Sequence, residues 1–357
     1  MKRFDFVLLA AIILIILAGL ATLYSIGVTS GESIFSRQLL ALGIGLAVFF
    51  TAAFLDYRAV SQYARFFYVL AVVLLIAVLF IGGEVRGSNR WIPLGGFNLQ
   101  PVEFAKIALI LVLAKFFTKK RGEVRDAKVL THSVVFMLIL MVLVLLQPDL
   151  GSAIMLFAIW ATLLIFTPVK KKHIAVLLVL LLLVGAAGWY GFLHDYQKDR
   201  ILTFVNPEAD PQGTGYNVRQ SIIAVGSGEF LGRGLGRGFQ SHLKFLPERH
   251  TDFIFASFAE ELGFLGSSLL LVAFGLMFWR LILIARRSAD SLGFYLVLGV
   301  AALIIIQVFI NIAMNIGLMP VTGITLPLVS YGGSSLISTL FLLGLAQSVY
   351  RRSQAGI

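Results

Sequence analysis

The side chains with the clearest chemical potential lie between residues 246 and 266, where a polar segment meets an apolar one. This stretch reads LPERHTDFIFASFAEELGFLG; its charged part ends at Thr251 and Asp252, and an aromatic-rich run begins at Phe253. A carboxylate fixed at such a border can accept a proton from a hydroxyl group, as a general base does. Asp and Thr are also good helix N-caps, and an acid in the first turn suits the helix dipole. The pattern alone favours base and cap equally.

A second candidate group lies near the start of the apolar run 101–118. Glu103 and Lys106 are three residues apart, which places them on one face of a helix. Ionisable groups near a membrane span usually face a cavity or a partner. The alternative is a self-contained salt bridge in which Lys106 extends outward along its aliphatic stem. Upstream, Arg90 and Trp91 could bind an anion beside an aromatic surface, or could serve as an interfacial anchor.

A glycine- and arginine-rich segment, Gly213–Phe239, is the third candidate. One interpretation is an ordered lip in which backbone amides and the guanidiniums of Arg219, Arg233 and Arg237 face phosphate oxygens. The other is a flexible linker made of turns. The apolar residues 222–225 favour an ordered, partly buried segment. The glycines do not form a nucleotide fingerprint, because no strand–turn–helix pattern surrounds them.

Three further polar features lie in or beside apolar runs. Gln307, Asn311 and Asn315 recur every four residues and form one stripe, which either bonds neighbouring helices or lines a cavity. The sequence PLVSYGGSS, Pro327–Ser335, indicates irregular backbone at membrane depth, which must be buried in protein or line a cavity. Asp149 in QPDLG is predicted to be a helix cap in a tight outer turn.

The composition places these residues in a membrane protein. The 357 residues are 59% hydrophobic and 13% charged, with a mean hydropathy of +0.94, which is too apolar for a soluble protein of this size. The net charge of +11 invites a nucleic-acid interpretation, but basic residues in membrane proteins mainly set topology. There is no cysteine, so disulfides, cysteine-ligated zinc and thiol chemistry are excluded.

The lengths of the apolar runs predict ten membrane spans. They are residues 6–26, 37–55, 66–82, 101–118, 132–147, 151–168, 173–192, 262–284, 292–317 and 332–350. Residues 6–26 are too long for a signal-peptide core and should be retained as the first helix. Lys and Arg concentrate in alternate short connections, beginning with Lys2 and Arg3, which places both termini in the cytoplasm.

The predicted fold is therefore all-α and polytopic, with residues 1–357 forming one transmembrane domain. Residues 193–251 form a large extracytoplasmic loop between helices 7 and 8. The inner connections are short and mostly basic, whereas the outer ones hold the candidate residues. The chemistry should therefore face outward. No internal repeat of the kind seen in many transporters is visible in the sequence.

Six stretches lie in a fixed order along the chain: Arg90–Lys106, Gln147–Ala153, Gly215–Gly228, Leu246–Ala256, Glu260–Gly266 and Gly317–Ser335. Together with the ten-span layout, they resemble the SEDS family (shape, elongation, division, sporulation) of peptidoglycan polymerases over nearly the whole chain. One departure is Val102, where the family usually has Ser; no catalytic role depends on it. The short segment before the first span is more similar to the RodA branch than to the FtsW branch.

The resemblance implies a peptidoglycan glycosyltransferase of the bacterial cytoplasmic membrane that serves cell elongation and shape. Its substrate would be lipid II, the undecaprenyl-diphosphate-linked disaccharide-pentapeptide, polymerised at an extracytoplasmic active site. By motif match, Asp252 is the essential aspartate and Glu103 with Lys106 the charged pair. The further residues matched to the family's substrate cavity are Arg90, Arg219, Gln220, His250, Thr251, Ser330, Tyr331 and Gly332.

The resemblance also implies two kinds of helper. A class B penicillin-binding protein would crosslink the strands. No cofactor is expected to be tightly bound, but a divalent cation, Mg²⁺ or Mn²⁺, should assist, with Glu103 or Asp252 as its ligand. Membrane lipids are expected to contact the chain, and nucleic acid is not.

Elementary chemistry agrees with this implication. Transfer from a diphosphate-linked sugar needs a base for the acceptor hydroxyl and cations for the leaving diphosphate. Asp252 can supply the base, while Lys106, Arg90 and Arg219 supply positive charge. An inverting single displacement is the simplest scheme, because it needs no second carboxylate as nucleophile. The lipid tail needs an apolar groove that opens sideways into the bilayer.

Two rival functions remain. A lipid II flippase, which is a transporter, would explain the polar pair near the fourth span and the stripe in the ninth. It predicts polar residues through the cytoplasmic halves of the spans, where few occur: Lys115 and Arg280 lie near inner ends. A scaffold that only positions a transpeptidase would explain the spans but not Asp252 or the glycine-rich loop.

Overall fold

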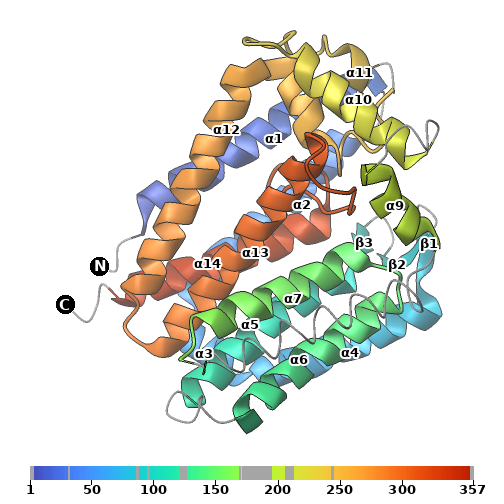
Figure 1. Cartoon of the computed structure of the whole chain (residues 1–357). Coiled ribbons are helices and arrows are strands. Elements are labelled where there is room, and N and C mark those ends of the chain that lie inside the picture. Colours follow the sequence, from blue (N-terminus) through green and yellow to red (C-terminus); the bar gives the residue numbers. More distant parts are fainter. Residues whose placement is uncertain are drawn as a thin grey trace.

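The computed structural model describes residues 4–30, 33–85, 88–94, 97–120, 127–168, 170, 195–205, 213–242 and 245–353. Its long helices are α1 (Phe6–Ser30), α2 (Ile34–Phe54), α4 (Ala64–Ile81), α5 (Pro101–Lys119), α6 (Ala127–Leu145), α7 (Leu150–Ile165), α12 (Ile254–Arg286), α13 (Ser291–Asn315) and α14 (Gly333–Ser353). The shorter ones are α3 (Tyr57–Gln62), α9 (Asp195–Val205), α10 (Thr214–Ser227) and α11 (Phe239–His242). Figure 1 shows the long helices gathered into one bundle, with α9, α10 and α11 at one end.

Nine of the ten predicted spans coincide with these long helices, and the predicted span 173–192 lies outside the described residues. Seven of the described helices are long and apolar enough to cross a membrane: α1, α2, α4, α6, α12, α13 and α14. Of the remaining two, α7 is apolar but has 16 residues, and α5 carries Glu103, Lys106 and Lys115. The chain is therefore a polytopic membrane protein with at least seven candidate spans.

The centre of the bundle is formed by α5, α13 and α14, whose side chains are buried on almost every face. Helix α2 packs along α14 through small residues, which let the two backbones approach closely. At Gly344, an added Cβ would lie 2.5 Å from the carbonyl oxygen of Phe49. A larger residue there would push the two helices apart.

Helix α12 is broken once, at Gly263, whose φ of 65° and ψ of −163° are outside the helical region. A break leaves backbone groups without helical partners, and burial makes each unpaired group unfavourable. The glycine-rich segment 229–234 supplies the partners. The hydrogen bonds are Arg233 N to Glu260 O, Gly234 N to Glu261 O, Phe264 N to Glu229 O and Leu265 N to Phe230 O, all between 2.8 and 3.0 Å.

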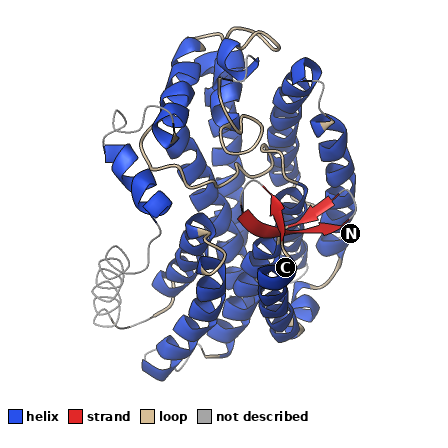
Figure 2. Cartoon of the chain, turned by 90° about the vertical axis from the view of Figure 1, so that its right-hand side faces the viewer, coloured by secondary structure: helices blue, strands red, loops and turns tan. Residues whose placement is uncertain are grey.

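A small antiparallel sheet, absent from the all-α prediction, occupies much of the predicted polar loop between the third and fourth spans. Its strands are β1 (Gly83–Val85), β2 (Ser88–Leu94) and β3 (Phe97–Leu99), in the order β1-β2-β3. Ile92 pairs with Leu99 and Leu94 with Phe97. Figure 1 shows the sheet at the end of the bundle away from the chain termini, and in Figure 2 the same strands face the viewer in front of the helices. Alternating apolar residues make such a ribbon possible, and packing against helices makes it stable.

Both described chain ends lie together at the end of the bundle opposite the sheet (Figure 1). Near the N-terminus, the Asp5 carboxylate pairs with the Arg280 guanidinium of α12. Near the C-terminus, the Arg351 guanidinium of α14 lies 4.9 Å from the ring centre of Phe4. This arrangement agrees with an even number of spans; which end faces the cytoplasm stays a prediction.

Candidate active site

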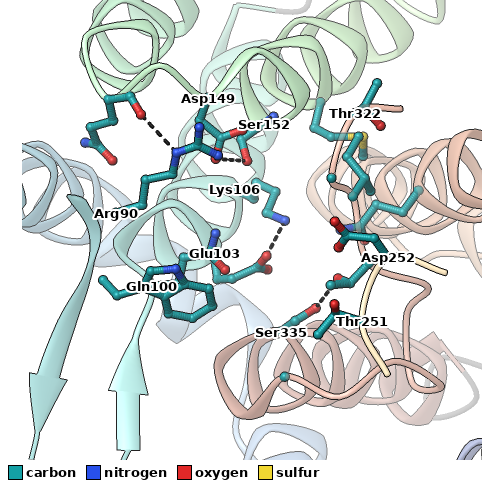
Figure 3. Close-up of a pocket in the computed structure, with 18 of the residues that line it drawn as sticks. Arg90, Gln100, Glu103, Lys106, Asp149, Ser152, Thr251, Asp252, Thr322 and Ser335 are labelled. Carbon is teal, nitrogen blue, oxygen red and sulfur yellow. Dashed lines mark hydrogen bonds and ion pairs between the residues drawn. The ribbon is translucent and has the colours of Figure 1, made fainter. Parts of the chain in front are cut away.

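A cavity of about 740 Å³ lies at the end of the bundle away from the chain termini. Its wall combines β2, the start of α5, the turn before α7, α9, the segment that precedes α12, and the irregular segment between α13 and α14. Figure 3 shows Asp252 and the pair Glu103–Lys106 facing the cavity from opposite sides. Residues from distant parts of the sequence therefore meet in one polar space.

Asp252 lies two residues before α12 begins. Its backbone oxygen accepts hydrogen bonds from the Nδ2 atoms of Asn311 and Asn315, each at 2.9 Å, and its side chain lines the cavity. The N-cap of α12 is Phe253, whose side chain makes no capping hydrogen bond. The N-cap interpretation of Asp252 is therefore wrong, because the polar stripe of α13 holds the backbone at this point instead.

The irregular backbone around Gly323 lets the chain pass beside this carboxylate. Gly323 has a φ of +74°, and an added Cβ would lie 3.6 Å from the Asp252 Oδ2 atom. Asn311 also donates to the carbonyl oxygen of Ile324, at 2.8 Å. Both interpretations of the polar stripe thus hold in part: the two asparagines bond neighbouring segments, and Gln307 lines the cavity.

Glu103 and Lys106 form a buried ion pair on α5, with 2.6 Å between Lys106 Nζ and Glu103 Oε1. The Ser338 hydroxyl donates to the second Glu103 oxygen at 3.0 Å. Both charged residues also line the cavity. They lie on one face of α5, as the spacing predicted, and they combine the two alternatives: the pair is self-contained and faces the cavity.

Arg90 enters the cavity from β2, opposite Asp252 (Figure 3). Its Nε donates to the Gln147 carbonyl oxygen at 3.0 Å, and another guanidinium nitrogen donates to the Pro148 carbonyl oxygen. The Asp149 carboxylate lies 3.6 Å from Arg90 Nη1. Asp149 also caps α7, accepting from the Ser152 backbone N at 3.0 Å, as predicted. Asp149 therefore both caps α7 and holds Arg90 in its position facing the cavity.

The other predicted site residues divide into two groups. Thr251, Tyr331 and Gly332 line the cavity. Ser330 lies directly behind it, donating to the Thr251 carbonyl oxygen at 2.7 Å. His250 packs its ring against Tyr331, with 5.6 Å between the ring centres, and is not among the residues of the cavity wall. Ser330 and His250 therefore support the wall of the cavity but do not line it.

The arginines of the predicted lip, Gly213–Phe239, do not line the cavity. Arg219 is exposed on α10, Arg233 and Arg237 are exposed in the following turn, and Gln220 is also absent from the cavity wall. The segment is nevertheless ordered, since α10 packs against α12 and the turn closes the break at Gly263. In the described part of the chain the segment supports α12; contact of Arg219 and Gln220 with a substrate stays a prediction.

The polar residues of the cavity wall that were not predicted as site residues include Arg200 on α9, Glu248 and Gln147. Arg200 donates to the Val321 carbonyl oxygen at 3.4 Å. Glu248 accepts from the Thr251 hydroxyl at 2.8 Å. The motif QPDLG could have indicated Gln147, but Arg200 and Glu248 lie in a charged loop segment where nothing distinguishes them from solvated residues.

Among the described residues, no group of three His, Cys, Asp or Glu side chains could hold a metal ion by itself. Glu103 and Asp252 line the same cavity as separate carboxylates. Mg²⁺ is commonly bound by one or two carboxylates together with substrate phosphates and water. The acids of the cavity fit that mode, in which the substrate completes the coordination.

Several known proteins are similar to this chain in sequence and in fold. The family described as cell cycle protein, comprising FtsW, RodA and SpoVE, matches residues 2–355. Peptidoglycan glycosyltransferase MrdB of Escherichia coli K12 is 38% identical over 325 residues, covering 90% of this chain and 87% of its own. Stage V sporulation protein E of Bacillus subtilis is also 38% identical, covering 98% of both chains. A solved chain from a peptidoglycan synthase complex that coordinates polymerization and crosslinking is 33% identical, covers 98% of both chains and has a TM-score of 0.85.

Proposed function

We propose that this chain, which belongs to the FtsW, RodA and SpoVE family and is a peptidoglycan glycosyltransferase, polymerises lipid II with Asp252 as general base. The observation that carries the proposal is the cavity in which Asp252 faces the buried pair Glu103–Lys106, with Arg90 on the same wall as the pair. A base and cations on opposite sides of one space suit a reaction that deprotonates a hydroxyl and releases a diphosphate.

The step is a single displacement at the anomeric carbon of the donor sugar. The acceptor hydroxyl oxygen forms the new bond to that carbon, and its proton moves to the Asp252 carboxylate. The bond between the carbon and the diphosphate oxygen breaks, and the diphosphate leaves with the electron pair. Attack and departure on opposite faces invert the configuration at this carbon.

The charges around the leaving group are held before the substrate arrives. Lys106 is fixed by Glu103, which is itself fixed by Ser338. Arg90 is fixed by Asp149 and by two carbonyl oxygens. Cations that are already oriented stabilise developing negative charge without reorganisation during the reaction. Glu103 and Asp149 therefore act as positioning residues.

A divalent cation remains part of the proposal. Asp252 or Glu103 would hold Mg²⁺ or Mn²⁺ together with the substrate diphosphate, where it would neutralise phosphate charge. The chain is a multi-pass protein, and we place it in the bacterial cytoplasmic membrane with ten spans, both termini inside and the cavity facing outward. Its basic inner connections support this orientation.

The proposed partner is a class B penicillin-binding protein that crosslinks the strands, and the proposed cellular role is elongation and shape. The similar chain from a peptidoglycan synthase complex supports a partner of that kind. The 38% identity to both MrdB and the stage V sporulation protein gives the role in elongation no preference over other roles of the family.

Polymerisation of purified lipid II tests the proposal directly. The purified chain would be assayed in liposomes, alone and with its cognate penicillin-binding protein, with Mg²⁺ or Mn²⁺ present or chelated. We expect glycan polymer, more of it with the partner, and less after chelation. The absence of polymer under every condition, with transfer of the lipid II head group across the bilayer instead, would overturn the proposal in favour of a flippase.

A further inference from the structure

A second, smaller cavity of about 160 Å³ adjoins the first beside the start of α7. Its wall is mainly apolar and is formed by Leu150, Gly151 and Ile154 of α7 and by Met319, Pro320 and Val321 of the segment after α13. Ile154 is 38% exposed, so this wall continues to the outer surface of the bundle. The small cavity therefore connects a polar site with a surface that faces lipid in a membrane protein.

Arg90 and Arg200 line both cavities, as do Asp149 and Thr322. Arg90 is anchored through Asp149 and the Gln147 and Pro148 carbonyl oxygens, and Arg200 through the Val321 carbonyl oxygen. Two guanidiniums thus stand at the border between the polar and the apolar space. Arginine binds phosphate oxygens through a planar set of donors, so this border suits an anion with more than one phosphate.

The size of the small cavity limits what can enter. An engineered apolar cavity of about 150 Å³ binds benzene, so 160 Å³ has room for a single five-carbon isoprene unit. The start of α7 also lies close to the opposite wall, because an added Cβ on Gly151 would be 2.6 Å from the Thr322 carbonyl oxygen. A sugar or a peptide would leave its polar groups against apolar side chains, which is unfavourable.

We propose that Arg90 and Arg200 bind the diphosphate of a polyprenyl-linked substrate, and that the first isoprene unit occupies the small cavity. The rest of the chain leaves past Ile154 into the bilayer, and the sugar on the other side of the diphosphate enters the large cavity. This assignment rests on the proposed function, since it names where the lipid carrier of the same substrate binds. It makes Arg200 a substrate-binding residue and Ile154 a determinant of tail binding.

The test compares two small probes with the same head group: dimethylallyl diphosphate, which carries one isoprene unit, and methyl diphosphate. Binding to the purified full-length chain in nanodiscs would be measured by ligand-observed NMR titration. Burial of the four extra apolar carbons predicts about 10²-fold tighter binding of the dimethylallyl probe to the wild type. Because the readout is binding, it is independent of whether the chain polymerises lipid II.

Two substitutions on α7 form a matched pair. Ile154→Trp should fill the small cavity and reduce the preference for the dimethylallyl probe to near onefold. Ile165→Trp, at the other end of α7 where the side chain is 66% exposed, should keep the full preference. Met319→Trp fills the cavity from the opposite wall and should repeat the result of Ile154→Trp if that variant folds poorly.

Arg200→Ala should weaken both probes by a similar factor and leave the preference between them unchanged. An unchanged preference in folded Ile154→Trp and Met319→Trp would overturn the tail site, and undiminished binding of methyl diphosphate to Arg200→Ala would overturn the arginine site. If the wild type makes no polymer from lipid II but both binding predictions hold, the result would count against the proposed function alone.

Discussion

The two ends of the bundle use the same residue types differently. At the end that holds the chain termini, Asp290 caps α13 by accepting from the Gly293 backbone N at 2.8 Å. It also accepts from Arg58 Nε at 2.7 Å and from the Tyr57 hydroxyl at 3.0 Å. Burial raises the pKa of Asp290, but the bonds from Gly293, Arg58 and Tyr57 outweigh it and hold the pKa below its ordinary value. This carboxylate is committed to joining helices.

Of the carboxylates at the cavity end, Asp149 is of that kind and Asp252 differs from it. Asp149 caps α7 and pairs with Arg90, much as Asp290 caps α13 and pairs with Arg58. Asp252 is not the N-cap of α12; its backbone oxygen is held by α13, and its side chain lines the cavity. Asp290 should thus govern stability alone, Asp149 should govern both stability and the position of Arg90, and Asp252 should govern the reaction.

Apart from the loss of Asp252 itself, the largest expected effect concerns the charged pair of α5. Lys106→Ala should reduce polymerisation by about 10²- to 10³-fold, the usual loss when one stabiliser of developing charge is removed. It also leaves Glu103 buried and unpaired, which costs about 3–5 kcal/mol of stability. The double variant Glu103→Gln, Lys106→Met removes the charges together. If the double variant regains stability and also regains wild-type polymerisation, the pair is structural and Lys106 has no part in the reaction.

A smaller effect is expected from the residues that hold the Asp252 backbone. Asn311→Ala removes one of the two donors to the Asp252 carbonyl oxygen, leaving Asn315 as the other, and does not touch the carboxylate. Misplacement of a reacting group by about 1 Å can reduce the rate by about 10²-fold. We expect a fall of that order at most in kcat, with little change in KM for lipid II. A change confined to KM would show that Asn311 serves binding and not the position of the base.

The smallest effect belongs to the opposite end. Because the folded pKa of Asp290 is lowered, its stabilisation is full above the ordinary pKa of 3.8 and is lost as pH falls through the folded value. Asp290→Asn should therefore lower stability near neutral pH by about 0.5 kcal/mol or less, given solvent screening. Thermal unfolding between about pH 6 and about pH 3 should show the difference from wild type shrinking as pH falls. A difference independent of pH would contradict the assigned cause.

Periodicity and run length predicted the spans well, since apolar runs leave a membrane chain few other structures. The start of α12 was misplaced, at 262 instead of 254, because Glu260 and Glu261 look like the polar border of a span. Both are fully buried. Glu260 accepts from the backbone N atoms of Gln240 and Ser241 and from the Ser241 hydroxyl, contacts that only the folded loop provides.

The candidate site was predictable where one motif carries both the residue and its position. Glu103 and Lys106 share a helical face, and Asp252 marks a border between polar and apolar sequence, so both lie where expected. Arg219 and Arg200 show the limit. Both are arginines in the same long loop, but the tertiary packing of α9 and α10 places Arg200 in the cavity wall and leaves Arg219 exposed.

The most direct test of Asp252 as the base is a crossed comparison of Asp252→Asn and Asp290→Asn. Each variant would be measured for lipid II polymerisation rate and for thermal unfolding in the same preparation. We expect Asp252→Asn to lose about 10²- to 10⁴-fold in rate, the usual contribution of a general base, while its unfolding temperature stays near that of the wild type. Asp290→Asn should keep its rate. Substantial polymerisation by folded Asp252→Asn would contradict the account.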